Sequence, residues 1–170
     1  MTDMIVTAKK ILNQTNFSAD LADIMDPKNY IELVNMQKRY RELLALINDD
    51  LTQLKKTGEP SYAYKIGKLI FEFKENYRQK GIEIRGLRNQ MREDLKVSRS
   101  RLGYFMTFYK LYRQDSIDDS LSWGYYQELI NISNAEIRNK IYNLIKQGKI
   151  TSINQIRSLK KELTQAKKRP

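Results

Sequence analysis

Residues 91–105 form the stretch MREDLKVSRSRLGYF, in which two segments with helical spacing are joined by a short polar break. Apolar residues recur at steps of three and four at either end of the stretch, and this spacing places them on one face of a helix. Ser98 follows Lys96 and Val97, and serine is a preferred residue for capping the start of a helix. The pattern predicts one helix that ends near Leu95 and a second helix that begins after Ser98.

Two short helices with such a turn are typical of a helix-turn-helix. Apolar residues and a serine occur at the spacing of the motif L-G-V-S-x-x-T-V. The matching residues are Leu95, Val97, Ser98 and Leu102. Two positions depart from the motif, because Arg92 stands where a small residue is usual and Lys96 stands where glycine is common. We expect Val97 to fill the space between the two helices.

The second helix, predicted over 99–113, carries apolar residues around most of its circumference. These residues are Leu102, Phe105, Met106, Phe108, Tyr109, Leu111 and Tyr112. The positions left over form one narrow polar stripe at steps of three and four. The stripe consists of Arg99, Gly103, Thr107, Lys110 and Gln114. A helix of this kind suits insertion into the major groove of DNA. Gly103 costs about 1 kcal/mol in a helix interior, but it would permit close approach to the DNA.

The basic residues of this segment predict how it would contact DNA. Residues 84–113 contain eight basic and two acidic residues, so they carry +6 of the chain's net charge of +11, and such an excess favours polyanionic partners. The first turn of a recognition helix usually contacts base edges, and arginine can bond both O6 and N7 of guanine. The candidates for base contact are Arg99, Ser100, Arg101, Gly103 and Thr107. The candidates for phosphate contact, which position the protein without specifying sequence, are Arg85, Arg88, Arg92, Lys96 and Lys110.

Helical spacing also dominates the rest of the chain of 170 residues, and no alternating strand pattern is found. Further helices are predicted at 28–56, 62–80, 84–94, 122–131, 134–147 and 152–166. The fold is predicted to be all-α, a multi-helix domain that contains a helix-turn-helix and a long N-terminal amphipathic helix. We divide the chain into an N-terminal helical region (1–57), a helix-turn-helix core (58–115) and C-terminal helices that pack on the core (116–170).

The long helix at 28–56 is predicted to start at Asp26-Pro27 and has almost coiled-coil spacing. Its apolar seam consists of Leu33, Met36, Tyr40, Leu43, Ile47 and Leu54. Because paired DNA half-sites are usually bound by dimers, we expect a homodimer that forms through this seam. The alternative is that the seam packs onto its own domain. Ser61 is expected to cap the helix that follows, at 62–80.

The composition leaves little ordinary catalytic chemistry. Cysteine and histidine are both absent, which removes disulfides, thiolate metal sites, the usual zinc ligand and the commonest general base. The Glu-Phe-Lys triplet at 72–74 lies on a predicted helix without an upstream strand aspartate, so it does not indicate a nuclease. The paired aspartates at 49–50 and 118–119 are interpreted as solvated caps near helix ends or in loops. We therefore expect no enzymatic activity, no metal and no cofactor.

The amino-terminal residues do not predict secretion. The first residues, MTDMIVTAKKILNQ, include Asp3, Lys9 and Lys10 and contain no unbroken apolar core, so they do not resemble a signal peptide. No stretch approaches the roughly 18 apolar residues of a membrane-spanning helix. We expect a cytoplasmic protein with no membrane partner.

Three stretches of the chain, taken in order, resemble a known bacterial family. They are Tyr64-x-Ile66-Gly67-x-x-Ile70, the segment 91–105 and Leu121-Ser122-Trp123-x-x-Tyr126-x-x-Leu129-Ile130. The match covers roughly residues 45–165 and is to the N-terminal helix-turn-helix domain of proteins that carry a PD-(D/E)XK nuclease domain and occur near restriction and mobile-element genes. This chain departs from the family because it has Ile150-Thr151 where a tryptophan precedes the last helix, and because it ends without a nuclease half. The resemblance therefore implies association with DNA rather than its cleavage.

The sequence thus predicts a non-catalytic protein that binds double-stranded DNA with a helix-turn-helix at about 87–113. Its expected role is that of a regulator or accessory factor of a mobile element, plasmid or virus, for example in transcription regulation. The alternative is a helical adapter whose partner is another protein. RNA binding is a third hypothesis, although the sequence lacks the motifs of the usual RNA-binding modules.

Overall fold

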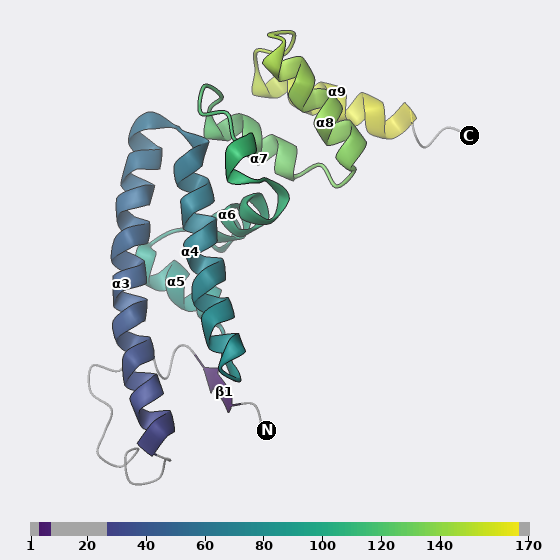
Figure 1. Cartoon of the computed structure of the whole chain (residues 1–170). Coiled ribbons are helices and arrows are strands. Elements are labelled where there is room, and N and C mark those ends of the chain that lie inside the picture. Colours follow the sequence, from purple (N-terminus) through teal and green to yellow (C-terminus); the bar gives the residue numbers. More distant parts are fainter. Residues whose placement is uncertain (1–3, 8–26, 167–170) are drawn as a thin grey trace.

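The computed structural model describes residues 4–7 and 27–166, and this part of the chain is mostly helical, which confirms the expected class (Figure 1). The helices are α3 (Pro27–Thr57), α4 (Pro60–Gln79), α5 (Leu87–Leu95), α6 (Arg99–Leu111), α7 (Trp123–Ile130), α8 (Ala135–Lys146) and α9 (Ile153–Ala166). A 3-10 turn, η1 (Gln114–Ser116), follows α6, and the two strands are β1 (Met4–Thr7) and β2 (Ile82–Arg85). Asp26, the predicted cap of the first long helix, lies outside the described residues. None of the described helices has the length and apolar character needed to cross a lipid bilayer.

The two strands form a small parallel sheet, which the sequence pattern did not predict. Met4 lies opposite Ile82, and Thr7 lies opposite Arg85. The expectation that the chain contains no strand is therefore wrong at these two places. The predicted helix at 84–94 is also wrong at its start, because α5 begins only at Leu87.

The physical reason for the second strand lies in residues 81–86. Ile82 and Ile84 are buried while the residues that follow each of them are exposed, which is the alternation of a half-buried strand. Gly81 and Gly86 flank the strand with φ angles of 74° and 76°, a backbone conformation that glycine adopts without steric cost. A continuous helix cannot run through either position, so α4 and α5 are separated.

Helices α3 and α4 lie side by side and antiparallel, joined by a tight turn at Gly58 (Figure 1). The residues of the predicted seam are all buried within the same chain. They are Leu33, Met36, Tyr40, Leu43, Ile47 and Leu54. The seam is therefore not available to a second copy, and the alternative of packing onto its own domain holds for these residues. Tyr40 also donates a hydrogen bond of 2.6 Å to Asp94, which ties α3 to α5.

Helix α4 packs directly against α6 at a position where only glycine fits. A Cβ atom at Gly67 would lie 2.8 Å from the carbonyl carbon of Phe105 and 2.9 Å from the Cβ of Tyr109. These separations are too short for carbon atoms in van der Waals contact. The absence of a side chain at Gly67 thus sets how closely the two helices approach.

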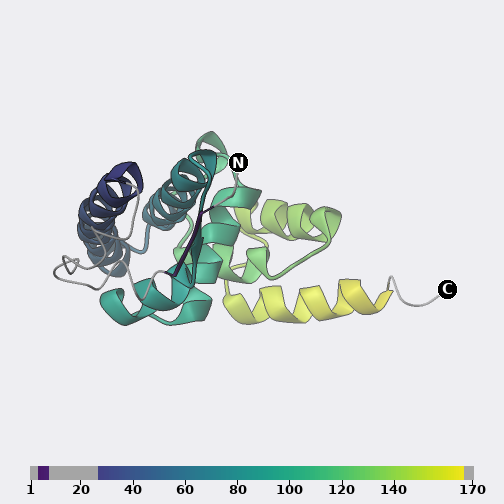
Figure 2. The same ribbon diagram turned by 90° about the horizontal axis from the view of Figure 1, so that it is seen from below.

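Helix α7 packs on α6 and on the end of α4 that lies away from β1, and α8 and α9 pack on α7 (Figure 1). Figure 2 shows α3 and α9 on opposite sides of the molecule. Trp123 is only 7% exposed, and its ring packs against Phe105 and Phe108 of α6. Its backbone N–H donates to the carbonyl of Gly58 at 2.8 Å, which connects α7 to the α3–α4 turn. One core cluster of buried residues extends from Leu33 to Ile156 and so draws on all three predicted regions of the chain.

The start of α4 differs from its prediction. Glu59 occupies the N-cap position and Pro60 the first helical position, so Ser61 is not the cap. Proline suits this place because its missing N–H would have no partner in the first turn. The N–H of Ser61 instead donates to Asp119 at 2.9 Å, so a carboxylate from a distant loop satisfies the helix start.

We expect Gly67→Ala to lower the free energy of unfolding by about 1–3 kcal/mol, because the added methyl group forces α4 and α6 apart. Gly103→Ala is the matched control. A Cβ at Gly103 would meet nothing within 4 Å, and alanine favours a helix interior over glycine by about 1 kcal/mol. Urea unfolding followed by circular dichroism should therefore give opposite signs for the two variants. Equal changes in stability for the two variants would contradict the close approach of α4 and α6 at Gly67.

The buried tyrosines predict a loss of stability in alkali. Burial raises the pKa of Tyr112 to about 12, and burial together with the hydrogen bond to Asp94 raises the pKa of Tyr40 from its ordinary 10.0. Burial likewise raises the pKa of Tyr126. Because the folded state holds these protons more tightly than the unfolded state, their stabilisation is complete below pH 10 and declines as the pH rises above it.

Tyrosinate absorbance and circular dichroism should be followed together in an alkaline titration. Tyr40, Tyr112 and Tyr126 are expected to ionise only as the helical signal is lost. A titration in which all eleven tyrosines ionise together while the fold remains intact would contradict this expectation.

Candidate nucleic-acid interface

Helices α5 and α6 are connected by a turn of three residues, 96–98, as the sequence predicted. Lys96 has a φ angle of 54° and is the only non-glycine residue with positive φ in the described part of the chain. It occupies the position at which the motif favours glycine, which adopts this conformation more readily. Ser98 accepts a hydrogen bond from the N–H of Arg101 at 3.1 Å, so its predicted role as the cap of α6 is confirmed.

The residues predicted to contact bases lie mainly on the solvent side of α6. Arg99, Ser100 and Thr107 are exposed, and the space around Gly103 is open. Arg101 is different because it is half-buried, with its guanidinium 5.8 Å from the ring centre of Phe105. A cation over an aromatic face is attracted to the ring, so Arg101 is held along the helix rather than extended from it.

The opposite side of α6 faces the core. Leu102, Phe105 and Phe108 are fully buried at steps of three residues. Leu111 was predicted to belong to this apolar set, but it is 41% exposed. Its position in the last turn of α6 explains the difference, because Tyr112 already ends the helix with extended backbone. The exposed surface of α6 is consequently wider than the predicted narrow stripe.

The residues predicted to contact phosphates fall into two groups. Arg85 and Arg92 form exposed ion pairs with Glu83 and Glu93, at 3.2 and 3.3 Å. Exposed pairs of this kind contribute at most about 1 kcal/mol and are screened by salt, so either arginine can exchange its partner. The second group, which makes no ion pair with any residue in the described ranges, consists of Arg88, Lys96 and Lys110.

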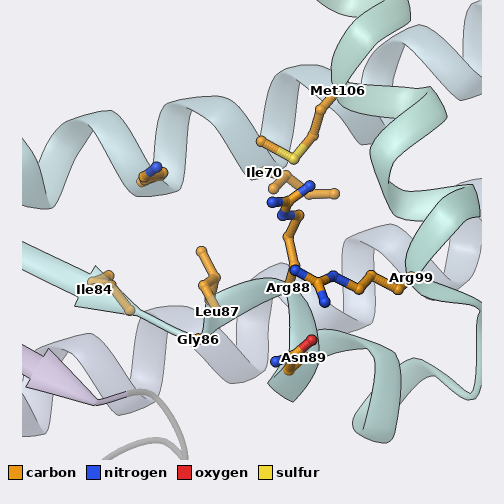
Figure 3. A pocket seen from close by; sticks show the side chains of 9 residues that line it. Ile70, Ile84, Gly86, Leu87, Arg88, Asn89, Arg99 and Met106 are labelled. Carbon is orange, nitrogen blue, oxygen red and sulfur yellow. The ribbon is translucent and has the colours of Figure 1, made fainter.

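A cavity of about 180 Å³ lies where α4, the turn between β2 and α5, and α6 meet. Its buried and half-buried lining is apolar and comprises Ile70, Ile84, Leu87 and Met106. Its exposed lining is polar or basic and comprises Lys74, Arg88, Asn89 and Arg99, with Gly86 between them. Figure 3 shows the side chains of Arg88 and Arg99 reaching into the same space from α5 and α6. We call this the basic cavity.

Lys74 is the member of the basic cavity that sequence reasoning did not find. It lies on α4, a helix that the sequence placed next to the predicted DNA-binding segment but not in it. No local pattern marks it, because only the packing of α4 on α6 places Lys74 and Arg99 in the lining of the same cavity. The sequence also assigned Arg99 to base edges, whereas its side chain lines the basic cavity together with Arg88.

A second, more open groove lies at the other end of α6. Four aromatic residues line it, and Phe71 and Tyr109 lie with their ring centres 5.3 Å apart. The lining also contains Lys110, whose ammonium group is 5.9 Å from the ring centre of Phe71. The full lining is Tyr64, Phe71, Tyr109, Lys110, Tyr112, Arg113, Gln114 and Asp115. Basic residues thus border both hollows that lie along α6.

The acidic residues are arranged as structural groups where the structure describes them. Asp118 accepts hydrogen bonds from Ser120, and these bonds lower the pKa of its carboxyl group below the ordinary value. Asp119 accepts a hydrogen bond from the start of α4, so its interpretation as a cap is confirmed. Asp118 lies in the same loop but pairs with Lys146 and does not cap a helix. The pair at 49–50 was wrongly placed near a helix end, because it lies inside α3. Across the described ranges, no three acidic side chains gather in a way that could hold a metal ion.

Several of the residues that carry the family resemblance lie in the core. Ile66 and Ile70 of α4 are fully buried, and Trp123 and Tyr126 of α7 pack around Phe108. The resemblance is thus one of packing positions. Comparison of the chain with family models, with curated protein sequences and with solved structures gives no match.

Proposed function

We propose that this protein binds double-stranded DNA without catalysing a reaction, and that α5 and α6 act as a helix-turn-helix with α6 in the major groove. The observation that carries the proposal is the exposed side of α6, where basic residues without acidic partners in the described structure surround small side chains. A neutral protein surface would mix charges of both signs, and a partner with many negative charges complements this one.

The shape of α6 supports approach to a groove. Ser100, Gly103 and Thr107 are small and lie on its solvent side, and Gly103 has open space beside it. An α-helix fits the major groove when its exposed face carries no bulky obstruction. Under the proposal these three residues face the base edges, and Arg101 reaches a base only if it leaves the ring of Phe105.

The surrounding charges support the phosphate contacts. Lys96 and Arg88 lie at opposite ends of α5, and Lys110 lies in the last turn of α6. Arg85 and Arg92 join them by exchanging Glu83 and Glu93 for phosphate oxygens. The exchange costs little because both ion pairs are exposed.

The proposed role is that of a regulator or accessory factor of a mobile element, plasmid or virus, in the cytoplasm. Its support comes from the sequence resemblance to a DNA-associated domain. A homodimer stays part of the proposal only if it forms through a surface other than the α3 seam, because that seam is buried. A single copy would contact one half-site.

A helical adapter for another protein is the second candidate. Exposed large apolar residues on α3 favour it, since Ile31 and Val34 are 59% and 41% exposed and adjacent on one face. The remaining ones, Leu46 and Leu111, lie further along α3 and on α6, so they do not extend that patch. A protein interface generally requires a larger contiguous surface, so DNA binding is the better-supported function.

The first test uses Lys96→Gly. Glycine should relieve the strained backbone at this position and stabilise the fold by about 1 kcal/mol, while it removes one phosphate contact. Affinity for a mixed-sequence duplex, measured by fluorescence anisotropy over a salt series, should fall steeply as salt rises. The plot of log affinity against log salt concentration should be less steep by about 0.9 in the variant, because one fewer phosphate is contacted.

Lys140→Gly is unsuitable as a control because it weakens α8, so Lys140→Gln serves instead. Lys140 is exposed on α8, at the far end of the molecule from α5, and its variant should keep the wild-type slope (Figure 1). Undetectable duplex binding at low salt would reject DNA binding and favour the adapter.

The second test introduces bulk on the solvent side of α6. Gly103→Leu should preserve or improve the stability of the helix, because leucine has a higher helix propensity and the site is open. It should nevertheless lower the affinity for duplex DNA at least about tenfold, since the side chain would hold α6 away from the groove. Gly103→Ala should have a smaller effect. Wild-type affinity in Gly103→Leu would show that this face of α6 does not contact DNA.

A further inference from the structure

Three cations from three different elements converge on the basic cavity. Lys74 comes from α4, Arg88 from the first turn of α5 and Arg99 from the first turn of α6. No acidic residue lines the cavity, and none of the three makes an ion pair with a residue that the structure describes. The nearby acids Glu83 and Glu93 are already paired with Arg85 and Arg92. Like charges directed into one space repel each other, and an anion between them would remove that repulsion.

The walls of the cavity add hydrogen-bond donors to this charge. Helix α5 begins here at Gly86, which has a φ angle of 76° and provides no side-chain cap for the helix start. The N–H of Asn89 in this first turn already donates to the carbonyl of Gly86 at 3.0 Å, which leaves the N–H groups of Leu87 and Arg88 to favour an anion. The side chain of Asn89, which also lines the cavity, can donate as well.

The apolar lining makes these donors more effective. Ile70, Ile84 and Leu87 are buried at the cavity and reduce the access of water behind the charged groups. Hydrogen bonds from charged donors are stronger where the surroundings are less polar. Two guanidinium groups with planar sets of donors also suit the oxygens of a phosphate better than lysines alone would.

We propose that the basic cavity binds one phosphate group, held by Lys74, Arg88 and Arg99 at the start of α5. This site adds to the proposed function. It rests on that function only in one respect, which is that DNA would supply the phosphate. A DNA backbone phosphate would make Arg99 a positioning contact rather than a base contact. A small phosphorylated compound would present the same chemistry to the cavity.

Inorganic phosphate is the first probe, added to the full chain at constant ionic strength and followed by amide NMR. The largest shifts are expected at Leu87, Arg88 and Asn89. Arg88→Gln and Arg99→Gln should each weaken phosphate binding at least about tenfold, because each removes a charged donor. Arg99→Lys should retain part of the affinity, since it keeps the charge but loses the planar pair of donors.

Arg113→Gln is the matched control, because it removes the same charge from an exposed arginine that lies just beyond the other end of α6 and is paired with Asp115. It should change phosphate affinity by less than about twofold if the cavity, rather than the general field, binds the anion. The proposal is overturned if Arg113→Gln weakens binding as much as Arg88→Gln does. Shifts of equal size on α8 would overturn it as well.

The source is distinguished with duplexes in which single phosphates are replaced by neutral methylphosphonates. If DNA supplies the phosphate, one replacement should weaken the wild type but have no further effect on Arg99→Gln. If a small compound supplies the phosphate, no methylphosphonate replacement should weaken duplex binding by the wild type. A nucleoside monophosphate should then bind more tightly than inorganic phosphate, and its binding should depend on Arg88 and Arg99 in the same way. Phosphate binding without DNA binding rejects only the proposed function, whereas DNA binding without phosphate binding at the cavity rejects only this inference.

Discussion

The contact of Gly67 with the backbone of Phe105 determines how the rest of the molecule is arranged. Because nothing separates the two helices at this crossing, α6 lies directly on α4, and its buried side is fixed by that contact and by the aromatic rings of α7. The solvent side of α6 is then fixed as well. The basic cavity is lined by residues of both α4 and α6, so it also depends on this crossing. One missing side chain thus determines both the packing and the candidate interface.

The charges follow a second constraint, which is that the core uses almost no ionised side chains. Among the described residues, the buried polar side chains are Gln37 and Gln90, and Asp94 is partly buried where it accepts hydrogen bonds from Tyr40 and Gln90. The excess of basic residues must therefore lie on the surface. Where acids are near, as for Arg85 and Arg92, they form weak exposed pairs. At the basic cavity, no described acid forms an ion pair with Lys74, Arg88 or Arg99, so their positive charges are not neutralised by direct contact.

Most of the helices could be predicted from the sequence, because each buries one side and so repeats apolar residues at steps of three and four. The cap at Ser98 could be predicted too, and Lys96 could be recognised as an unusual turn residue, because both features depend only on residues close by in the sequence. The strands were not predicted, since β2 has four residues and its partner lies far away in the chain. The seam of α3 was assigned to a dimer because a buried face looks the same in the sequence whether its partner is another copy or α4. Lys74 was noticed only as part of the triplet at 72–74, and nothing in the sequence links it to the basic cavity, because its place there depends on a tertiary contact.

The pairing of β1 with β2 also has a consequence for how the chain folds. The sheet pairs a strand that precedes α3 and α4 in the chain with a strand that follows them. Met4 lies opposite Ile82, and Thr7 lies opposite Arg85. Closing so large a loop loses chain entropy before any contact compensates for it, and contacts of high sequence separation form late in folding. The helical hairpin of α3 and α4 joins residues that are closer in the sequence, so it closes a shorter loop. We therefore expect the sheet, and the wall that Ile84 gives to the basic cavity, to form after this hairpin.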